Sequence, residues 1–431
     1  MRIIYSFLFY FSTPFIISRL LWRSLKNPAY RQRILERFGF YSQSYQQHGI
    51  WFHAVSVGEC EAIFPLIRLI QPREPQLPIL ITTTTPTGSA RVKAVLGDTV
   101  QHVYLPYDLP DVIVRFLNTF KPKIAVIVET EIWINLFQAC EKRKIPLYLI
   151  NARLSEKSVR GYQKISSLVL PALNAMTQIA TQSETDKNRF IEIGAKSEKV
   201  ENLGNIKFDL TIEDKIFEQA RDLKIKLFLN RFVFIAASTH DGEEILLFET
   251  YKNLKKQIPQ LLLAIAPRHP ERFGDVDLLA KNVNLKTVKR TAKQICENET
   301  DIFLIDTLGE LKLFYATADI AFVGGSFVPI GGHNVLEPAA AGVPVLFGLE
   351  MKNFAFISEK MLEAQAALQC RNIADLETKT LELYHQVELR NALRENAKKF
   401  IKENQGTTER IYTLLISQIA NQTRHPQIEQ I

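Results

Sequence analysis

Short apolar runs rich in β-branched residues alternate with longer amphipathic stretches along most of the chain after Gly49. In the first half these runs predict strands at 50–55, 78–84, 103–105, 124–128, 146–150, 178–181 and 199–203. In the second half they predict strands at 232–237, 261–266, 285–288, 302–305, 320–323 and 343–347. Strands that alternate with helices are typical of parallel sheets covered on both faces. We therefore predict an α/β fold with two doubly wound domains.

A charged and mostly helical passage from Thr211 to Asn230 separates the two series of strands. We place an N-terminal domain at 24–215 and a C-terminal domain at 216–431. Helical patterns at 376–385, 389–403 and 407–421 finish the chain, and the last of these helices can pack back on the N-terminal domain. Ligands of doubly wound sheets bind beyond the carboxyl ends of the strands, so we expect functional residues in the loops that follow the strands.

Residues 1–23 form an apolar segment in which Arg19 is the only charge between Ile3 and Trp22. About 20 apolar residues are enough to cross a bilayer. Pro14 and Arg19 weaken a clean span, whereas Trp22 and the basic residues after it suit a helix at headgroup level. A cleaved signal peptide is disfavoured because no A-x-A-like site follows. We expect a membrane anchor that either spans the bilayer once or lies in its interface.

The formal net charge of +7 is concentrated beside this segment. Residues 1–50 carry a surplus of six positive charges, since only Glu36 opposes Arg2, Arg19, Arg23, Lys26, Arg31, Arg33 and Arg37. A short helix is predicted at 29–38, and its basic side chains either rest on anionic lipid or are simply solvated. The basic flank places the bulk of the protein in the cytoplasm. A nucleic-acid partner is disfavoured because a basic stripe on a folded domain is missing.

The composition, 46% hydrophobic and 23% charged residues, is that of a globular protein. The four cysteines are far apart without C-x-x-C spacing, so neither a zinc site nor a disulfide framework is indicated. The sequence lacks G-x-x-x-x-G-K-[ST], H-E-x-x-H and the usual G-x-G-x-x-G motif. These absences disfavour a P-loop NTPase, a zincin and an NAD enzyme.

Polar loops follow several predicted strands of the first domain. Glu59 falls in the first turn of a helix, where a carboxylate serves either as a general base or merely as a partner of the helix dipole. Thr87 and Gly88 belong to a hydroxyl-rich loop before another helix, which suits either a phosphate or sugar ligand or ordinary turn and cap chemistry.

Charged residues follow three more strands of this domain. Glu129 and Glu131 share one strand end, where two carboxylates bind a cation, share a proton or orient a base, unless the loop is solvated. Arg153 and Lys207 follow other strands and suit an anionic ligand.

The second domain has its own group of loops. Ser238, Thr239 and His240 lie between a strand and a helix, in a segment that predicts a phosphate cradle. Further polar or glycine-rich loops occupy 266–272, 306–311, 324–326 and 331–338. Taken singly, each of these loops is explained equally well by a structural role, as a turn, a helix cap or a buried polar group. Their convergence on one side of one sheet favours a ligand site.

Several of these segments together resemble the bacterial transferases of 3-deoxy-D-manno-octulosonic acid (Kdo). The similar segments, in chain order, are 55–59, 85–88, 104–108, 129–133, 151–155, 267–272 and 331–338. This order, which extends from the anchor to Gly348, is far more specific than any single motif. Ile134 and Val335 depart from the pattern, where proline is common, and neither supplies a functional side chain.

The resemblance implies a GT-B fold, with two Rossmann-like domains facing a central cleft. It also implies transfer of Kdo from CMP-Kdo to a lipid A precursor, lipid IVA, in lipopolysaccharide core biosynthesis at the cytoplasmic face of the inner membrane. One or more Kdo units would be added with inversion at the anomeric carbon, without a catalytic metal or a cofactor. Two alternatives stay open: a membrane-associated GT-B transferase that uses a UDP-sugar, and a noncatalytic sugar-nucleotide-binding membrane protein.

By position, the resemblance makes Glu59 the general base and assigns Glu129 and Lys207 to stabilisation of the transition state. The implied CMP contacts are Pro267, Arg268, Leu308, Gly309, Glu310, Asn334, Val335, Leu336 and Glu337. Further candidate substrate contacts are Thr87, Gly88, Glu131, Arg153, Ser238, Thr239 and His240. One tension concerns Glu59: a helix N-terminus lowers a carboxyl pKa, whereas exclusion of water, Glu129 and Glu131 would raise it.

Overall fold

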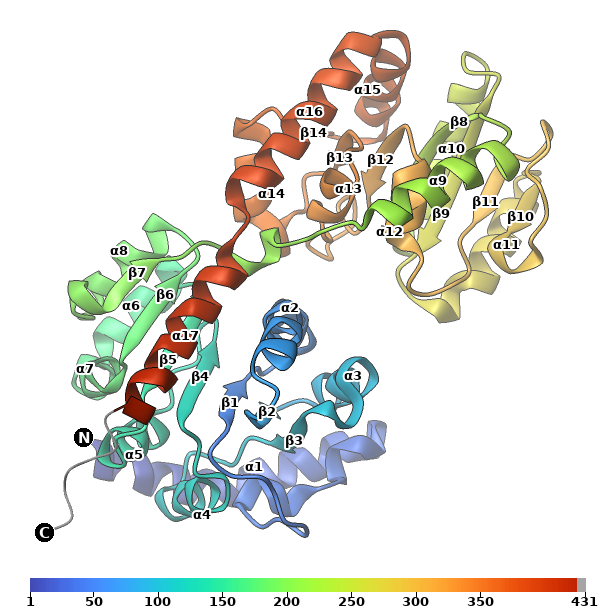
Figure 1. Ribbon diagram of the computed structural model, residues 1–431. Coiled ribbons are helices and arrows are strands. Elements are labelled where there is room, and N and C mark those ends of the chain that lie inside the picture. Colours follow the sequence, from blue (N-terminus) through green and yellow to red (C-terminus); the bar gives the residue numbers. More distant parts are fainter. Residues whose placement is uncertain (425–431) are drawn as a thin grey trace, which may run out of the picture. The chain divides into compact units, whose positions relative to one another are not determined.

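The computed structural model describes residues 1–424 and divides into two compact units (Figure 1). Unit 1 comprises Met1–Asp209 and the segment from Gln405, which contains helix α17 (Thr407–Arg424). Unit 2 comprises Leu210–Asn404. The boundary predicted between residues 215 and 216 falls inside helix α9 (Asp214–Lys226), because the charged passage that suggested it is itself a helix. Residues 425–431 of the predicted C-terminal domain lie outside the described residues.

Unit 1 is built on a parallel sheet of seven strands in the order β3-β2-β1-β4-β5-β6-β7. Their bounds are β1 Ile50–His53, β2 Ile79–Thr83, β3 Gln101–Tyr104, β4 Ile124–Val128, β5 Leu147–Ala152, β6 Gln178–Thr181 and β7 Val200–Asn202. All residues of β1, β2, β4 and β5 are buried, as expected where helices cover both faces of a parallel sheet.

The helices of unit 1 pack against two hydrophobic cores. They are α1 Arg2–Lys26, α2 Val57–Arg73, α3 Pro86–Leu96, α4 Pro110–Phe120, α5 Ile134–Lys142, α6 Glu156–Lys164, α7 Ser166–Ala175, α8 Glu184–Glu192 and α17. Trp51 lies in one core with α4 and α5, while the next residue, Phe52, lies in the other with α2 and α17. This alternation follows from the two-residue period of a strand.

Unit 2 has a second parallel sheet of seven strands, in the order β10-β11-β9-β8-β12-β13-β14. Their bounds are β8 Phe232–Thr239, β9 Leu261–Pro267, β10 Thr287–Lys289, β11 Ile302–Leu304, β12 Ile320–Val323, β13 Val345–Phe347 and β14 Ala367–Gln369. Its helices are α9, α10 Glu243–Lys255, α11 Phe273–Asn282, α12 Leu311–Thr317, α13 Leu336–Ala340, α14 Ala355–Glu363, α15 Ile373–His385 and α16 Val387–Asn404. The two predicted doubly wound domains are therefore confirmed.

Each sheet has a switch point, where the strand order reverses. In unit 1 it lies between β1 and β4, which pair along Ile50–His53 and Ile124–Ile127. In unit 2 it lies between β8 and β12. Ligands bind at the carboxyl ends of strands at such points. The loops after β1, β4, β8 and β12 are therefore the expected positions of ligand-binding and catalytic residues.

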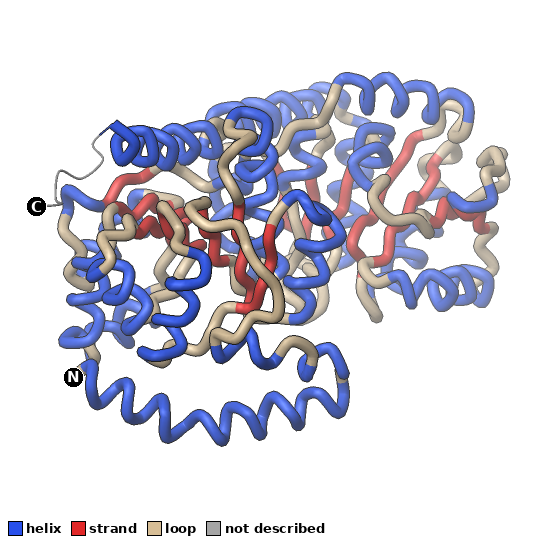
Figure 2. The backbone as a smooth tube through the Cα atoms, turned by 60° about the horizontal axis from the view of Figure 1, so that its bottom comes forward, coloured by secondary structure: helices blue, strands red, loops and turns tan. Residues whose placement is uncertain are grey.

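The segment after α1 differs from the predicted helix at 29–38. Two short 3₁₀ helices, Pro28–Arg31 and Ile34–Phe38, take its place. Arg33 separates them with a φ of 56°, which breaks any continuous helix. Its guanidinium donates to the His102 carbonyl at 2.7 Å and pairs with Glu36 at 2.7 Å. Contacts to the body of unit 1 therefore fix this turn. Figure 2 shows α1 running along the outside of the same unit.

Candidate active site

Glu59 lies just beyond the carboxyl end of β1, in the first turn of α2. The Glu59 amide donates to Oγ of Ser56, the N-cap, at 3.4 Å. In return, Glu59 Oε1 accepts from the Ser56 hydroxyl at 3.2 Å and Oε2 accepts from the Val55 amide at 2.7 Å. These reciprocal bonds resemble a capping box, which fixes the carboxylate against the loop that leaves the strand.

Burial raises the pKa of Glu59 to about 7. The hydrogen bond from Val55 opposes this shift, while the negative charges of Glu129 and Glu131 add to it. The sequence left open which influence dominates. In the structure, burial outweighs the hydrogen bonds from Val55 and Ser56 that lower the pKa. A carboxyl group that titrates near neutral pH is well matched to general base catalysis.

Glu129 follows β4, on the strand next to β1, and its side chain is only 7% exposed. Two cations from other loops bind its two oxygens. Oε2 lies 2.8 Å from a guanidinium nitrogen of Arg153, and Oε1 lies 3.2 Å from Nζ of Lys207. The structure thus brings together three predicted site residues. The two carboxylates of this loop also differ: Glu129 is bound by cations, whereas burial raises the pKa of Glu131.

Lys207 reaches Glu129 because the loop after β7 is fixed at several points. Asn205 accepts from the Lys207 amide at 3.0 Å, and Asn151 Oδ1 accepts from the Ile206 amide at 3.1 Å. Asn151 is fully buried and has a φ of 49° at the end of β5. It was not nominated from the sequence, although it opens the 151–155 motif. It now takes a positioning role.

Thr87 and Gly88 lie at the start of α3, whose N-cap Thr85 accepts from the Gly88 amide at 3.1 Å. Thr85 Oγ1 also donates to the Val55 carbonyl at 3.2 Å, which joins this loop to the one that carries Glu59. A Cβ at Gly88 would lie 3.0 Å from Thr85 Oγ1, so the cap needs a glycine or a small shift. Thr87 has an exposed side chain at the same helix terminus.

In unit 2, the fully buried carboxylate of Glu243 organises the ends of β8 and β12. It accepts backbone hydrogen bonds from His240, Gly325, Ser326 and Phe327 at 2.7 to 3.1 Å. Successive N–H groups of this kind form an anion-binding nest, and here the protein's own carboxylate fills it. These four amides are therefore not available to a phosphate.

The predicted residues Ser238, Thr239 and His240 lie at the carboxyl end of β8, next to that carboxylate's hydrogen bond with the His240 amide. Ser238 has a φ of 58°, and Thr239 Oγ1 donates to Glu244 at 3.1 Å. The Thr239 carbonyl accepts from the Arg268 amide at 3.0 Å, which joins this loop to the end of β9 and to Pro267. His240 Nε2 lies 2.7 Å from His333 Nε2. Sequence reasoning did not nominate Glu243 or His333, although both lie within motifs that it described.

The remaining residues predicted to contact CMP differ in how exposed their side chains are. Arg268 is exposed, Leu308 is 74% exposed, and Gly309 has a φ of 86° with open space beside it. Glu310 is held by Arg290 at 2.7 Å. Asn334 accepts from the Leu336 amide at 3.0 Å and donates to Glu337 at 3.2 Å.

Val335 and Leu336 are fully buried, so only their backbone atoms can meet a ligand. Their apolar side chains hold the start of α13 in place. Asn334 itself lies just before α13.

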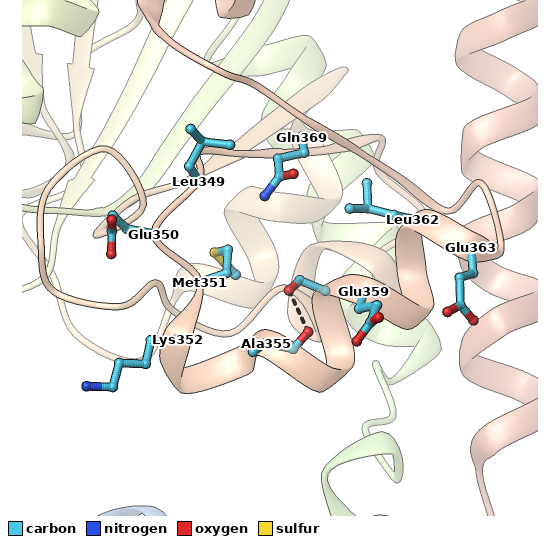
Figure 3. Close-up of a pocket in the computed structure, with 10 residues that line it drawn as sticks. Leu349, Glu350, Met351, Lys352, Ala355, Glu359, Leu362, Glu363 and Gln369 are labelled. Atoms are coloured by element: carbon cyan, nitrogen blue, oxygen red, sulfur yellow. Dashed lines mark hydrogen bonds between the residues drawn. The ribbon is translucent and has the colours of Figure 1, made fainter.

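A hollow of about 610 Å³ lies beside α14 in unit 2 (Figure 3). Its lining includes Leu349, Met351, Lys352 and the carboxylates of Glu350, Glu359 and Glu363. None of the predicted site residues lines it. Three carboxylates against one lysine make this hollow unfavourable for an anionic nucleotide.

The side chains suited to metals or disulfides are dispersed. Within residues 1–424, His, Cys, Asp and Glu form no group of three or more that could hold a metal ion. The four cysteines are buried and unpaired, and burial raises their pKa to about 12.

Two parallel seven-stranded sheets with switch-point sites define a GT-B fold. Solved structures of nucleotide-sugar proteins are similar to this chain. Anabaena HepE, determined with UDP, covers 86% of this chain and all of its own, with 14% identity and a TM-score of 0.56. UDP-GlcNAc 2-epimerase from Neisseria meningitidis has the same coverage, identity and TM-score. These similarities establish the fold.

Sequence comparisons then identify the family. Residues 32–210 match the family model of 3-deoxy-D-manno-octulosonic-acid transferase (kdotransferase). The chain is 40% identical to 3-deoxy-D-manno-octulosonic acid transferase from Haemophilus influenzae, over 96% of this chain and 98% of the relative. It is 36% identical to the transferase of the same name from Rickettsia felis, over 84% of this chain and 77% of the relative. The chain belongs to the Kdo transferase family, and it is a glycosyltransferase.

Proposed function

We propose that this enzyme transfers Kdo from CMP-Kdo to the lipid A precursor lipid IVA, with inversion, during lipopolysaccharide core assembly. The observation that carries the proposal is Glu59, a fixed carboxylate with a pKa of about 7, which follows β1, while Glu129 with its partner Lys207 follows the neighbouring strand β4. The CMP moiety follows from the motif resemblance at 267–268, 308–310 and 334–337. The proposed reaction uses no catalytic metal and no cofactor.

The geometry supports a single displacement. Glu59 accepts the proton of an acceptor hydroxyl while that oxygen bonds to the anomeric carbon of Kdo. The bond between this carbon and the phosphate oxygen breaks, and its electron pair leaves with CMP. Attack from the face opposite to the leaving group inverts the configuration. Lys207 and Arg153 carry positive charge at the edge of this site, where it stabilises anionic groups of the reacting sugars.

We also propose that α1 binds the inner membrane in its interface, from the cytoplasmic side. It is the one helix within residues 1–424 that is long and apolar enough to span a bilayer. One face is nevertheless bonded to unit 1, with Tyr5 donating to Asp108 at 2.9 Å and Ser6 to Asn135 at 3.1 Å. The other face exposes Phe7, Phe11 and Phe15 by about two thirds of their surface. A flat helix keeps these hydrogen bonds, whereas a spanning helix would break them.

The transfer is tested with purified full-length protein, lipid IVA and CMP-Kdo, with release of CMP as the readout. We expect turnover by the wild type, and a loss of 10²–10⁴-fold, on the order expected for a general base, in Glu59→Gln. Glu61→Gln is the matched control, because Glu61 lies on the same helix in an exposed pair with Arg91. Full activity of Glu59→Gln would overturn the base assignment. Inhibition by UDP but not by CMP would overturn the assignment of CMP-Kdo as the donor.

Membrane binding is tested by sedimentation with vesicles that contain anionic phospholipid. The double variant Phe7→Asp/Phe11→Asp should remain in the supernatant, because two charges replace the exposed apolar face. Leu278→Asp is the control, since this leucine is 59% exposed on unit 2. Equal binding by both variants would contradict the proposed orientation.

A further inference from the structure

Two imidazole rings lie against each other at the switch point of unit 2. His240 and His333 have their Nε2 atoms 2.7 Å apart, and the planes of their rings differ by only 3°. Neither ring is fully buried. The pair lies between two segments implied to contact the nucleotide, since Arg268 is bonded to the neighbour of His240 and Asn334 follows His333. The mechanism above assigns no role to this pair.

The loop that contains Gly325 leaves room for the two rings to approach each other. Gly325 has a φ of 66°, and a Cβ there would lie 2.9 Å from the His333 ring and 3.4 Å from the His240 ring. Any other residue at this position would push against the pair. Glu243 holds the same loop through the amides of residues 325 to 327. The close approach is therefore built into the loops, not left to free side chains.

A contact of this length allows only one proton between the two nitrogens. One ring donates its Nε2–H and the other accepts with its lone pair. If the accepting Nε2 takes up a proton, both rings become donors at Nε2 and their mutual hydrogen bond is lost. Two N–H groups then become free to bind an external acceptor. The pair can thus change from a closed neutral state to an open cationic state by gaining one proton.

Without a bound ligand, burial and the surrounding charges keep the His240–His333 pair neutral. Burial lowers the pKa of both rings, that of His333 to about 4. Arg268 and His269 lower the pKa of both rings further, and Arg272 also lowers that of His240. Glu243 is the one group that opposes this effect at His240, and its carboxylate is already occupied by backbone amides. A bound anion would raise the pKa of both rings, because it adds negative charge close to the pair and opposes the effect of Arg268.

We propose that the His240–His333 pair is the phosphate-binding element of the donor site and gains one proton when a nucleotide phosphate binds. This inference rests on the proposed nucleotide-sugar donor. The filled nest at residues 325 to 327 leaves side chains, not those amides, to hold the phosphate. When the bond between the anomeric carbon and the phosphate oxygen breaks, its electron pair stays on that oxygen. The imidazolium N–H groups donate hydrogen bonds to the newly charged phosphate and stabilise the leaving group.

Calorimetry of CMP binding to the full-length protein tests the proposal. Titration at pH 7.5 in two buffers of different ionisation enthalpy measures the protons gained on binding. We expect the wild type to gain about one proton per CMP, and the Kd to rise about tenfold for each pH unit above neutrality. His333→Asn should lose most of this uptake and its pH dependence. Because a phosphate itself titrates near pH 6, the difference between wild type and variant is the decisive quantity.

His385→Gln, a substitution on α15, should keep the uptake of the wild type. If His333→Asn does not fold, His240→Asn supplies the same comparison with the wild type. CMP binding without proton uptake, or equal uptake by wild type and His333→Asn, would overturn the proposal. A protein that binds UMP but not CMP would overturn the donor assignment instead, and the same measurement with UMP would then test the pair.

Discussion

Lys207 Nζ lies 3.2 Å from Oε1 of Glu129, although the two residues are 78 positions apart in the chain. The contact joins the loop after β7 to the loop after β4, across the intervening strands of the unit 1 sheet. Glu129 is 7% exposed and Lys207 is 29% exposed on their side chains. A buried carboxylate needs such partners, since its desolvation is costly. The pair therefore stabilises the site, and Lys207 contributes a positive charge to it.

Lys207→Met should remove both contributions. We expect the free energy of unfolding to fall by about 1–3 kcal/mol, because a buried charged group loses one partner while Arg153 remains. Transfer activity should fall by about 10²–10³-fold through loss of electrostatic stabilisation. Urea unfolding and CMP release measure the two effects. Lys207→Arg, which keeps the charge, should recover part of both. Unchanged activity in Lys207→Met would exclude a catalytic role for this pair.

The activity of the wild type should depend on pH through Glu59. A general base works only when deprotonated, so kcat/KM should rise as the pH passes about 7 and level off above it. Glu131→Gln removes one of the negative charges that raise this pKa, so the rising limb should move to lower pH. Glu61→Gln should leave the limb in place. A limb that does not move in Glu131→Gln would mean that the charge of Glu131 does not contribute to the pKa of Glu59.

Asp108 should be a main stabiliser of unit 1. It is 1% exposed and accepts from the amides of Asn135 and Leu136 at 3.0 and 2.8 Å, so it caps α5, whose own N-cap makes no side-chain bond. Asp108→Ala should lower the free energy of unfolding by about 1–3 kcal/mol, because two buried donors lose their acceptor. Asp111→Ala, at an exposed ion pair on α4, should cost less than about 1 kcal/mol. Equal losses in urea unfolding would contradict the capping role.

Gly325→Ala should strain the loop that holds the two histidines. The new methyl group would meet the His333 ring at 2.9 Å, and the residue would keep a left-handed φ of 66°. Left-handed backbone costs a non-glycine residue about 1–2 kcal/mol, to which the steric contact adds. Gly274→Ala, within helix α11 and with open space around it, should be neutral or stabilising by up to about 1 kcal/mol. The melting temperatures of the two variants compare these effects.

The hydrophobic pattern predicts the sheets well, because buried parallel strands are continuous apolar runs. The strands at 124–128, 178–181 and 320–323 have the predicted bounds. The strand β14 (Ala367–Gln369) was missed, since three residues without a β-branched side chain make no recognisable run. The helix predicted at 29–38 was wrong, because the left-handed conformation of Arg33 depends on distant contacts with His102 and Ser89.

The candidate site could be predicted as a set of residues but not as a geometry. The positions of Glu59, Glu129 and Lys207 at strand ends follow from the pattern. Their contacts could not be predicted from the pattern, since Glu129 adopts a φ of 64° that the local sequence does not indicate. The contact between His240 and His333 joins residues 93 apart, and it depends on how Glu243 folds the glycine loop. Such contacts are properties of the packed loops, and no local pattern encodes them.

The central claim is tested most directly by the mass of the lipid product. Purified protein is incubated with CMP-Kdo and lipid IVA, and the extracted lipid is analysed by mass spectrometry beside a Glu59→Gln control. We predict that lipid IVA gains the mass of one or more whole Kdo residues, and that the control leaves it unchanged. Unmodified lipid IVA after incubation with the folded wild-type enzyme and intact donor would contradict the account.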